Sequence, residues 1–245
     1  MDVRGEQRDN RGGVLLTNAP LFITAAHELK SPLALLRQLA LALEEGTLTE
    51  QEILDLGTRM RLTSERALRL TTDLTKTARL EDGLFALEPI NPVSLCEEVA
   101  NELQPLYVAK GKKLELSGRR KPLLGLANRD LLRRILLNFI DNALYYSDQE
   151  SPVKITASTR EKGQQIRLGV RDYGPMIPAK VWSTLGRGMG SDMQIMHNRP
   201  ESSGLGIFIT QQFANAMQAE VGVQRHRDGV TFYVDIAAST QLRLL

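Results

Sequence analysis

The chain has 245 residues, of which 42% are hydrophobic, and its 31 Lys+Arg against 29 Asp+Glu leave a formal net charge of +2. This length and composition predict a globular protein with a sizeable core, built as one large domain or two modest ones, and the near-neutral charge gives no electrostatic argument for binding nucleic acid or an anionic membrane surface. A single cysteine, Cys96, excludes an internal disulfide framework and fits a reducing, cytoplasmic compartment.

Residues 1–19 open with the polar run MDVRGEQRDNRGG, which lacks the apolar core of a signal peptide. We expect a flexible N-terminus there. No apolar run approaches the roughly 18 residues of a membrane span, so we expect any sensor or membrane segment to lie outside this chain.

Residues 20–82 place apolar side chains at alternating steps of four and three, which predicts two helices packed along a seam. The turn EEGTLTEQE separates the two helices, and Thr49 is expected to cap the second. A lone hairpin cannot bury both of its faces, so we expect a homodimer with a four-helix bundle. The predicted seam consists of Phe22, Ala26, Leu29, Leu33, Leu36, Ala40 and Leu43 in the first helix, and Ile53, Leu56, Met60, Thr63, Ala67, Leu70, Leu74 and Thr77 in the second.

The first helix contains an unusual polar group in the sequence HELKSPL. His27 lies one position past the seam residue Ala26, so we expect it to flank the core and face water, with Glu28 beside it and Ser31 one turn along. Pro32 gives up the backbone bond to the Glu28 carbonyl and is expected to bend the helix at a cost of about 3 kcal/mol. A partly exposed surface histidine is the simple interpretation, and the cost of the proline favours a functional one.

A linker over residues 83–92, with Gly83, Pro89 and Pro92, ends the heptad pattern. A second domain is expected over residues 93–238, followed by a tail over 239–245. Its patterns predict a helix and a strand, a helix capped by Asn128, two alternating strands, and a final hairpin at Asp228-Gly229. This order predicts an α+β fold in which helices cover one face of a sheet.

Two features of this second domain carry polar groups suited to a ligand. Asn138 and Asn142 lie one helical turn apart, so both amides project from one face toward a hard cation such as Mg²⁺. Asp172 ends a strand and is followed closely by Gly174, where the backbone can approach a flat ligand. Taken alone, each is equally well explained by ordinary helix or turn chemistry.

A third feature is a glycine pair, Gly204 and Gly206, which opens an amphipathic helix whose exposed amides suit phosphate oxygens. In chain order, the three features and the upstream histidine hairpin resemble the transmitter region of sensor histidine kinases over residues 20–238. HELKSPL is similar to the phosphoacceptor motif of that family, LLNFIDNALYYS to its asparagine box, and DYGPMI and SSGLGIFI to its two glycine boxes.

The resemblance implies a dimeric four-helix bundle followed by an ATP-binding α/β sandwich of the histidine kinase and gyrase type. It implies that His27 accepts the γ-phosphoryl group of ATP, that Glu28 acts as hydrogen-bond partner and general base, and that Ser31 can orient a water for dephosphorylation. The phosphoryl group then passes to an aspartate in the receiver domain of a response regulator. The resemblance further implies Mg²⁺ binding by Asn142, contact of Asp172 with the adenine amino group, and nucleotide contacts at Asn138, Gly174, Gly204 and Gly206.

This sequence departs from the family pattern at several positions. Met176 replaces the second glycine of the first glycine box, Tyr145 stands where a phosphate-contacting lysine is frequent, and Ser202 replaces the first glycine of the second box. The usual phenylalanine pair between the boxes is missing. We expect a nucleotide lid between about residues 173 and 203, in which Arg187 supplies a compensating cation.

Other interpretations share some of these signals. Gyrase, mismatch-repair and heat-shock ATPases carry the same Asn and Gly motifs but lack an upstream phosphoacceptor hairpin. A coiled-coil scaffold accounts for the heptads and leaves the strand-rich half unexplained. A degenerate transmitter, which dimerises and binds a regulator without catalysis, is favoured by the changes at Met176 and Tyr145.

Overall fold

The computed structural model describes residues 11–78, 80, 85–117, 124–147, 151–174 and 205–240, apart from the side chains at positions 11–22, 24, 78 and 145. Within these ranges, no helix has both the length and the apolar character required to cross a membrane.

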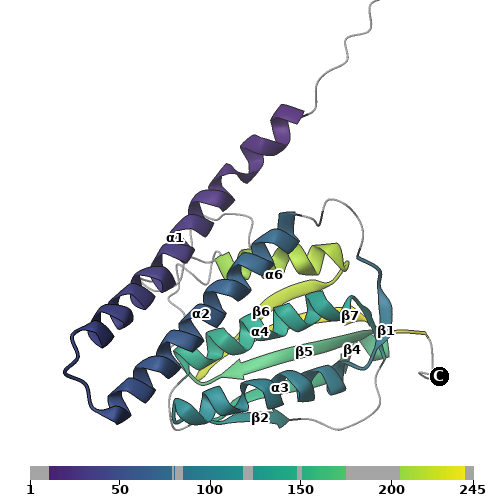
Figure 1. The fold of residues 1–245 in the computed structure, drawn as a ribbon. Helices are drawn as coiled ribbons and strands as arrows, with labels where there is room; N and C mark the ends of the chain where they lie inside the picture. Colours follow the sequence, from purple (N-terminus) through teal and green to yellow (C-terminus); the bar gives the residue numbers. More distant parts are fainter. Residues whose placement is uncertain are drawn as a thin grey trace, which may run out of the picture.

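Two long helices, α1 (Arg11–Glu44) and α2 (Glu50–Ala78), form the N-terminal hairpin (Figure 1). Helix α1 begins before residue 20, so helical backbone occupies part of the segment for which we expected flexibility, and it continues through Pro32. The predicted cap of α2 is confirmed. The Thr49 amide donates to Glu52 Oε2 at 2.7 Å, and the Glu52 amide donates to Thr49 Oγ1 at 3.4 Å.

The buried face of the hairpin differs in part from the predicted seam. Leu56 is buried as expected, whereas the buried positions among the described side chains of α1 are Ala25 and Leu39, each one residue before a predicted seam position. The seam residues Leu33 and Ile53 are 58% and 47% exposed. The reason is that a hairpin has two apolar flanks, and heptad spacing does not say which of them faces the rest of the same chain.

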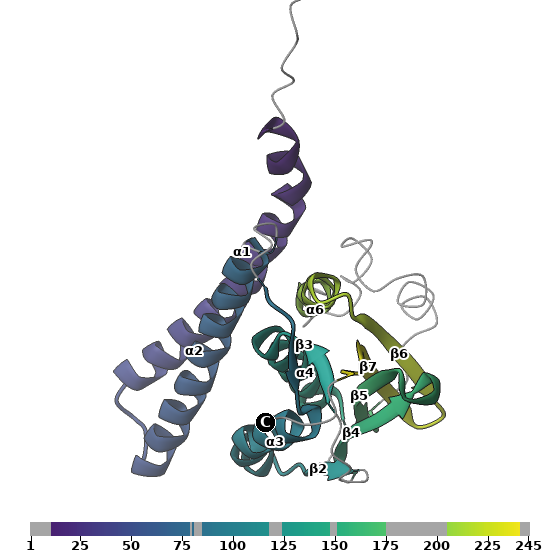
Figure 2. The ribbon, with the colours of Figure 1, turned by 90° about the vertical axis from the view of Figure 1, so that its right-hand side faces the viewer.

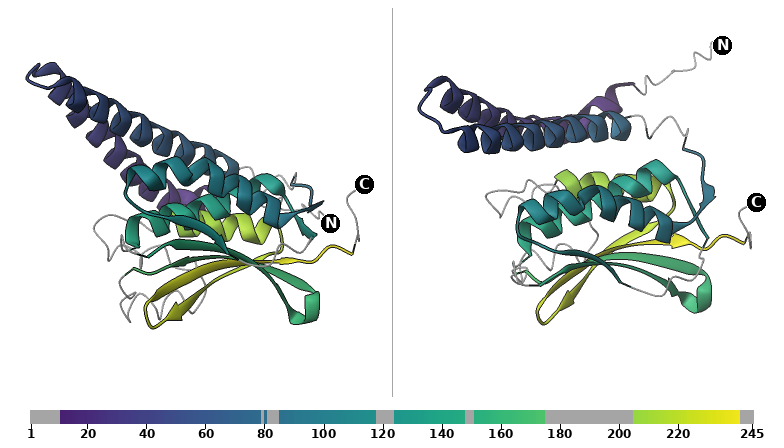
Figure 3. Two further views of the ribbon diagram at one scale, coloured as in Figure 1. Left: turned by 90° about the horizontal axis from the view of Figure 1, so that it is seen from below. Right: turned by 60° about the horizontal axis from the view of Figure 1, so that its bottom comes forward.

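The second domain is a mixed five-stranded sheet in the order β2-β4-β5-β7-β6, with β2 parallel to β4 and every other pairing antiparallel. Figures 2 and 3 show the helices of this domain on one face of the sheet, with the hairpin stacked outside them. The predicted α+β class is confirmed. The strands are β2 (Leu114–Ser117), β4 (Val153–Arg160), β5 (Gln165–Asp172), β6 (Glu220–His226) and β7 (Gly229–Ala237); the helices are α3 (Pro92–Ala109), α4 (Arg129–Tyr146) and α6 (Leu205–Ala216). A separate antiparallel pair, β1 (Glu88–Ile90) and β3 (Gly125–Ala127), lies at the entry to the domain.

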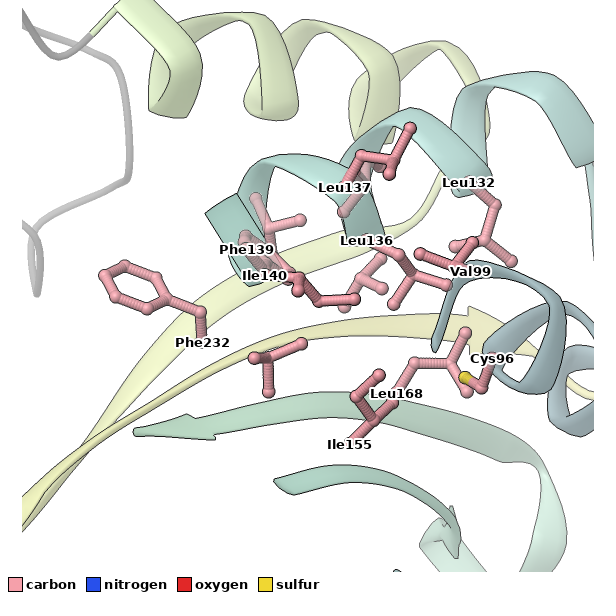
Figure 4. Packing of buried hydrophobic residues seen from close by; sticks show 14 of the residues in the cluster. Cys96, Val99, Leu132, Leu136, Leu137, Phe139, Ile140, Ile155, Leu168 and Phe232 are labelled. Carbon is pink, nitrogen blue, oxygen red and sulfur yellow. The ribbon is translucent and has the colours of Figure 1, made fainter. Parts of the chain in front are cut away.

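Helix α4 lies at the centre of the core (Figure 4). Its start is fixed by Asn128, whose Oδ1 accepts from the Leu131 amide at 3.1 Å, as the sequence predicted. On the sheet side, the Phe139 ring stacks on Phe232 of β7 with centroids 5.7 Å apart. Cys96 of α3 is fully buried in this core, and burial raises the pKa of its thiol to about 12, so the thiol is a neutral packing group.

The predicted hairpin turn at Asp228-Gly229 also supports the end of strand β5. Gly229 has φ of +138°, and a Cβ built there would lie 2.2 Å from the Asp172 carbonyl oxygen. Gly111, at the turn before β2, also has a positive φ of +67°, but a Cβ there would meet nothing within 4 Å.

We predict that Gly229→Ala lowers the free energy of unfolding by roughly 2 kcal/mol or more, because it adds a backbone clash to the strain of a positive φ. The matched variant Gly111→Ala carries the φ strain alone and should cost only about 1 kcal/mol. Urea denaturation monitored by circular dichroism measures both values. Equal losses in the two variants would contradict the role assigned to the contact with Asp172.

Candidate functional site

The first part of the candidate site joins the centre of α4 to the start of α6. The Asn138 side-chain amide donates to the Gly206 carbonyl and to Thr210 Oγ1, both at 3.2 Å, and Thr210 is fully buried. The structure therefore brings together two residues that the sequence selected, Asn138 and Gly206. Asn142 follows one turn later on α4 and is half-buried.

The second part is the end of strand β5, which lies against the last turn of α4. Asp172 is 4% exposed, and its Oδ1 accepts a hydrogen bond from the Gly174 amide at 3.1 Å. A Cβ at Gly174 would lie 1.9 Å from the Tyr146 carbonyl oxygen. We expected this glycine to allow approach to a ligand. In the structure, the missing side chain of Gly174 instead allows the end of β5 to pack closely against the last turn of α4.

Charged side chains connect α4 to helix α2 of the hairpin. Asp141, between the two asparagines of α4, lies 3.8 Å from Arg69 of α2. Burial raises the pKa of Asp141 despite the attraction of Arg69 and Arg66. Two further ion pairs join the same helices, Arg134 Nε to Asp73 Oδ1 at 3.3 Å and Lys76 Nζ to Asp130 Oδ2 at 3.1 Å.

Sequence reasoning missed these ion pairs. Arg69, Asp73 and Lys76 follow one another at steps of four and three, which places them on one face of α2. That spacing could have indicated a charged docking face. A charged stripe on a helix is ordinarily solvated, however, and only the position of α4 distinguishes the two cases.

The predicted phosphoacceptor group lies on α1. His27 and Ser31 are exposed, whereas Glu28 is half-buried. Ala25, two positions before His27, is 4% exposed and belongs to the same buried cluster as Leu205 of α6. Since α1 contacts α6, the helix that carries His27 lies against the helix that opens with the predicted phosphate-binding glycines.

Several predicted residues lie outside the described part of the chain. Their assigned roles stay predictions: Arg187 as a lid cation, Gly204 at the phosphates, the lid itself beyond Gly174, and the replacements at Tyr145, Met176 and Ser202. In the described ranges, no three His, Cys, Asp or Glu side chains cluster in a way that could hold a metal ion. Mg²⁺ prefers oxygen ligands and commonly keeps phosphate and water oxygens around it, and the side-chain amide oxygen of Asn142 is a ligand of that kind.

Comparisons with known proteins agree with this arrangement. Residues 127–240 match the family model described as histidine kinase-, DNA gyrase B-, and HSP90-like ATPase. The chain is 26% identical over 205 residues to the sensor protein CutS of Streptomyces coelicolor, covering 84% of this chain and 49% of CutS. It thus spans about half the length of that relative.

Solved structures show the same fold. Histidine kinase ThkA, in complex with the response regulator protein TrrA, superposes with a TM-score of 0.65 at 17% identity, covering 96% of this chain and 66% of that one. Full-length ShkA in complex with AMPPNP gives a TM-score of 0.57 at 24% identity, covering 88% of this chain and 46% of ShkA. The resemblance that the motifs indicated, and the fold class, are confirmed.

The interface between α2 and α4 leads to a prediction about pH. Asp73 is 6% exposed, and its Oδ1 accepts no hydrogen bond from the described residues. Burial raises the pKa of Asp73 above its ordinary value of 3.8 and outweighs the attraction of Arg134, Lys76 and Arg69. The folded protein therefore keeps this proton to a higher pH than the unfolded chain does, so the contribution of Asp73 to stability falls as the pH rises above 3.8.

We predict that Asp73→Asn gains stability relative to the wild type as the pH rises above 3.8, because an amide avoids the cost of burying a carboxylate. The trend is diagnostic, because the raised pKa of Asp73 already includes the attraction of Arg134, so the pH dependence reports the net effect of burial and pairing. Denaturation curves at several pH values give the difference, and Asp55→Asn, at an exposed position of α2, sets the baseline. A difference that stays flat or declines with pH would contradict the assignment.

Proposed function

Because residues 127–240 belong to the histidine kinase-, DNA gyrase B- and HSP90-like ATPase family, in a chain related to sensor histidine kinases, we propose that this protein phosphorylates its own His27 from ATP and transfers the group to an aspartate of a response regulator. One observation carries the proposal most directly. The phosphoacceptor hairpin and the ATPase-type domain pack together through α1 and α6, so a histidine and a nucleotide fold occur in one contiguous structure.

The chemistry assigned to His27 needs an exposed imidazole with a base beside it. His27 is exposed on α1, and Glu28 follows it directly. A lone pair of one ring nitrogen attacks the γ-phosphorus, a P–N bond forms, and the P–O bond to the leaving ADP breaks. Glu28 holds or takes the imidazole proton, which raises the nucleophilicity of the attacking nitrogen. Ser31, also exposed, is proposed to orient a water that hydrolyses the phosphorylated regulator.

The nucleotide contacts are assigned to the elements around α4. Asp172 is proposed to accept a hydrogen bond from the adenine amino group, and the helix start at Gly206 to face phosphate oxygens. Asn142 is proposed to hold Mg²⁺, which when bound neutralises charge on the phosphates. Asn138 fits a supporting role, since both donors of its amide already bind α6.

A homodimer through residues 20–82 forms part of this proposal. The apolar flank of the hairpin that the chain itself leaves uncovered includes large side chains on both helices, namely Ile23, Leu33, Leu35, Leu41, Ile53, Leu54 and Leu68. Pairing of two such flanks would form a four-helix bundle. We expect light scattering at micromolar concentration to give twice the 27.3 kDa chain mass, and Leu33→Asp with Leu68→Asp to reduce it to one chain. A monomeric wild type would exclude this part of the proposal.

The phosphoacceptor role is tested by incubation with radiolabelled ATP and Mg²⁺. We expect an acid-labile, base-stable label that disappears in His27→Ala and persists in the matched variant His226→Ala, whose histidine lies on β6. The His27→Ala variant should melt at nearly the same temperature as the wild type, because substitutions at exposed positions usually shift stability by no more than about 0.5 kcal/mol. An unlabelled wild type that still binds a regulator would instead support the degenerate transmitter.

The adenine contact is tested by calorimetry with ATP and GTP. Guanine presents an oxygen acceptor where adenine has its amino donor, so a buried Asp172 carboxylate should disfavour GTP strongly. We expect a preference for ATP of about tenfold or more in the wild type, largely lost in Asp172→Asn. Asp235→Asn, at a buried aspartate on β7, controls for loss of a buried charge. An unchanged preference in Asp172→Asn would remove Asp172 from the base site.

A further inference from the structure

The carboxyl-terminal half of α4 is held by the turn between α3 and β2. Tyr107 of α3 is fully buried, and its hydroxyl donates to the Ile140 carbonyl of α4 at 2.8 Å. Lys112, two residues before β2, is half-buried and donates through Nζ to the carbonyls of Leu144 at 2.6 Å and Ser147 at 2.7 Å.

These acceptors lie on either side of the end of α4. Ile140 lies one turn before the last turn of α4, Leu144 lies in the last turn, and Ser147 is the extended residue that follows the helix, so the two contacts of Lys112 hold the backbone on both sides of the helix end. The last carbonyls of a helix have no partner within it, and they form the negative end of its dipole. A lysine ammonium there supplies both a positive charge and donors to two carbonyls at once.

The segment held by Lys112 is the segment against which the base-binding strand end packs. The Tyr146 carbonyl lies between the two acceptors in sequence, and it leaves no room for a Cβ at Gly174. The Gly174 amide in turn donates to Asp172 Oδ1, which fixes the carboxylate. A displacement of residues 144–147 would therefore be passed through Gly174 to Asp172.

The turn that presents Lys112 is itself fixed in position. The Lys112 amide donates to the Tyr107 carbonyl at 2.9 Å, and Gly111 before it takes a positive φ of +67°. The Lys113 carbonyl accepts from Val153 of β4 at 2.8 Å, which ties the same turn to the sheet. The ammonium is thus held by a rigid backbone support, as a residue that positions a site should be.

We propose that Lys112 is a positioning residue of the nucleotide site, whose ammonium holds the carboxyl end of α4 so that Asp172 and Gly174 take the geometry that adenine requires. The inference rests on the proposed function, since it assigns this residue to the same nucleotide site.

The test compares ATP and GTP binding by calorimetry in the full chain. Lys112→Met keeps the length of the side chain and removes its charge and donors, Lys112→Arg restores both, and Lys113→Met alters the neighbouring exposed lysine. In Lys112→Met we expect ATP to bind about tenfold more weakly, with a smaller preference over GTP. Lys112→Arg should recover most of the loss, and Lys113→Met should match the wild type.

Amide hydrogen exchange without nucleotide provides a second readout. We expect faster exchange at residues 143–147 and 172–174 in Lys112→Met, with the centres of β5 and β7 unchanged. Folded Lys112→Met with wild-type affinity, preference and exchange would overturn the inference. If that variant does not fold, Lys112→Gln is measured in its place and judged by the same outcomes. A wild type that binds neither nucleotide would refute the proposed function, and the exchange data would then decide the positioning role separately.

Discussion

Helix α4 packs against several elements at once, and the fold and the candidate site both depend on that constraint. One face packs on the sheet through Phe139, another bonds to α6 through Asn138, and a third pairs with α2 through Arg134. Protein interiors are close-packed, so a helix enclosed in this way cannot slide or rotate without opening voids or breaking polar contacts. Side chains that must meet a ligand can therefore be placed with precision along it.

The same enclosure creates a cost at the end of the helix, where backbone carbonyls lose their partners inside α4. Buried polar groups are expensive unless they are hydrogen-bonded. Lys112 satisfies the Leu144 carbonyl in the last turn, Tyr107 holds the Ile140 carbonyl one turn earlier, and Gly174 permits close packing against Tyr146. Stability and site geometry thus share one set of contacts, so a change at this helix end would alter both.

The contact between hairpin and ATPase-type domain has a different character. Its ion pairs differ in exposure, from Asp130, whose side chain is 71% exposed, to Asp73 at 8%. Exposed ion pairs contribute only about 0–1 kcal/mol each to stability. In a buried ion pair, the cost of desolvating both charges offsets much of their attraction. Such pairs specify the orientation of α2 on α4 more than they add to stability. On the proposed function this is an advantage, because the domain must meet His27 and afterwards leave it free for a regulator.

The sequence by itself determined the features that depend on neighbours within a few positions. Heptad spacing predicted the two hairpin helices, Thr49 and Asn128 predicted the starts of α2 and α4, and Asp228-Gly229 predicted the final turn. The order of the motifs also predicted the family, because each motif is a short run of residues around one local structure. Capping, turn formation and periodicity act over one or two turns of chain, so they can be recognised without coordinates.

Only the tertiary structure decided which flank of the hairpin is covered, why Gly174 has no side chain, and what Lys112 holds. Each answer involves a residue distant in sequence, such as the Tyr146 carbonyl for Gly174 or the Leu144 carbonyl for Lys112. A half-buried lysine and a surface lysine look identical in a sequence. Their roles differ because burial and partners are set by packing between elements, and packing has no signature in the spacing of residues along one element.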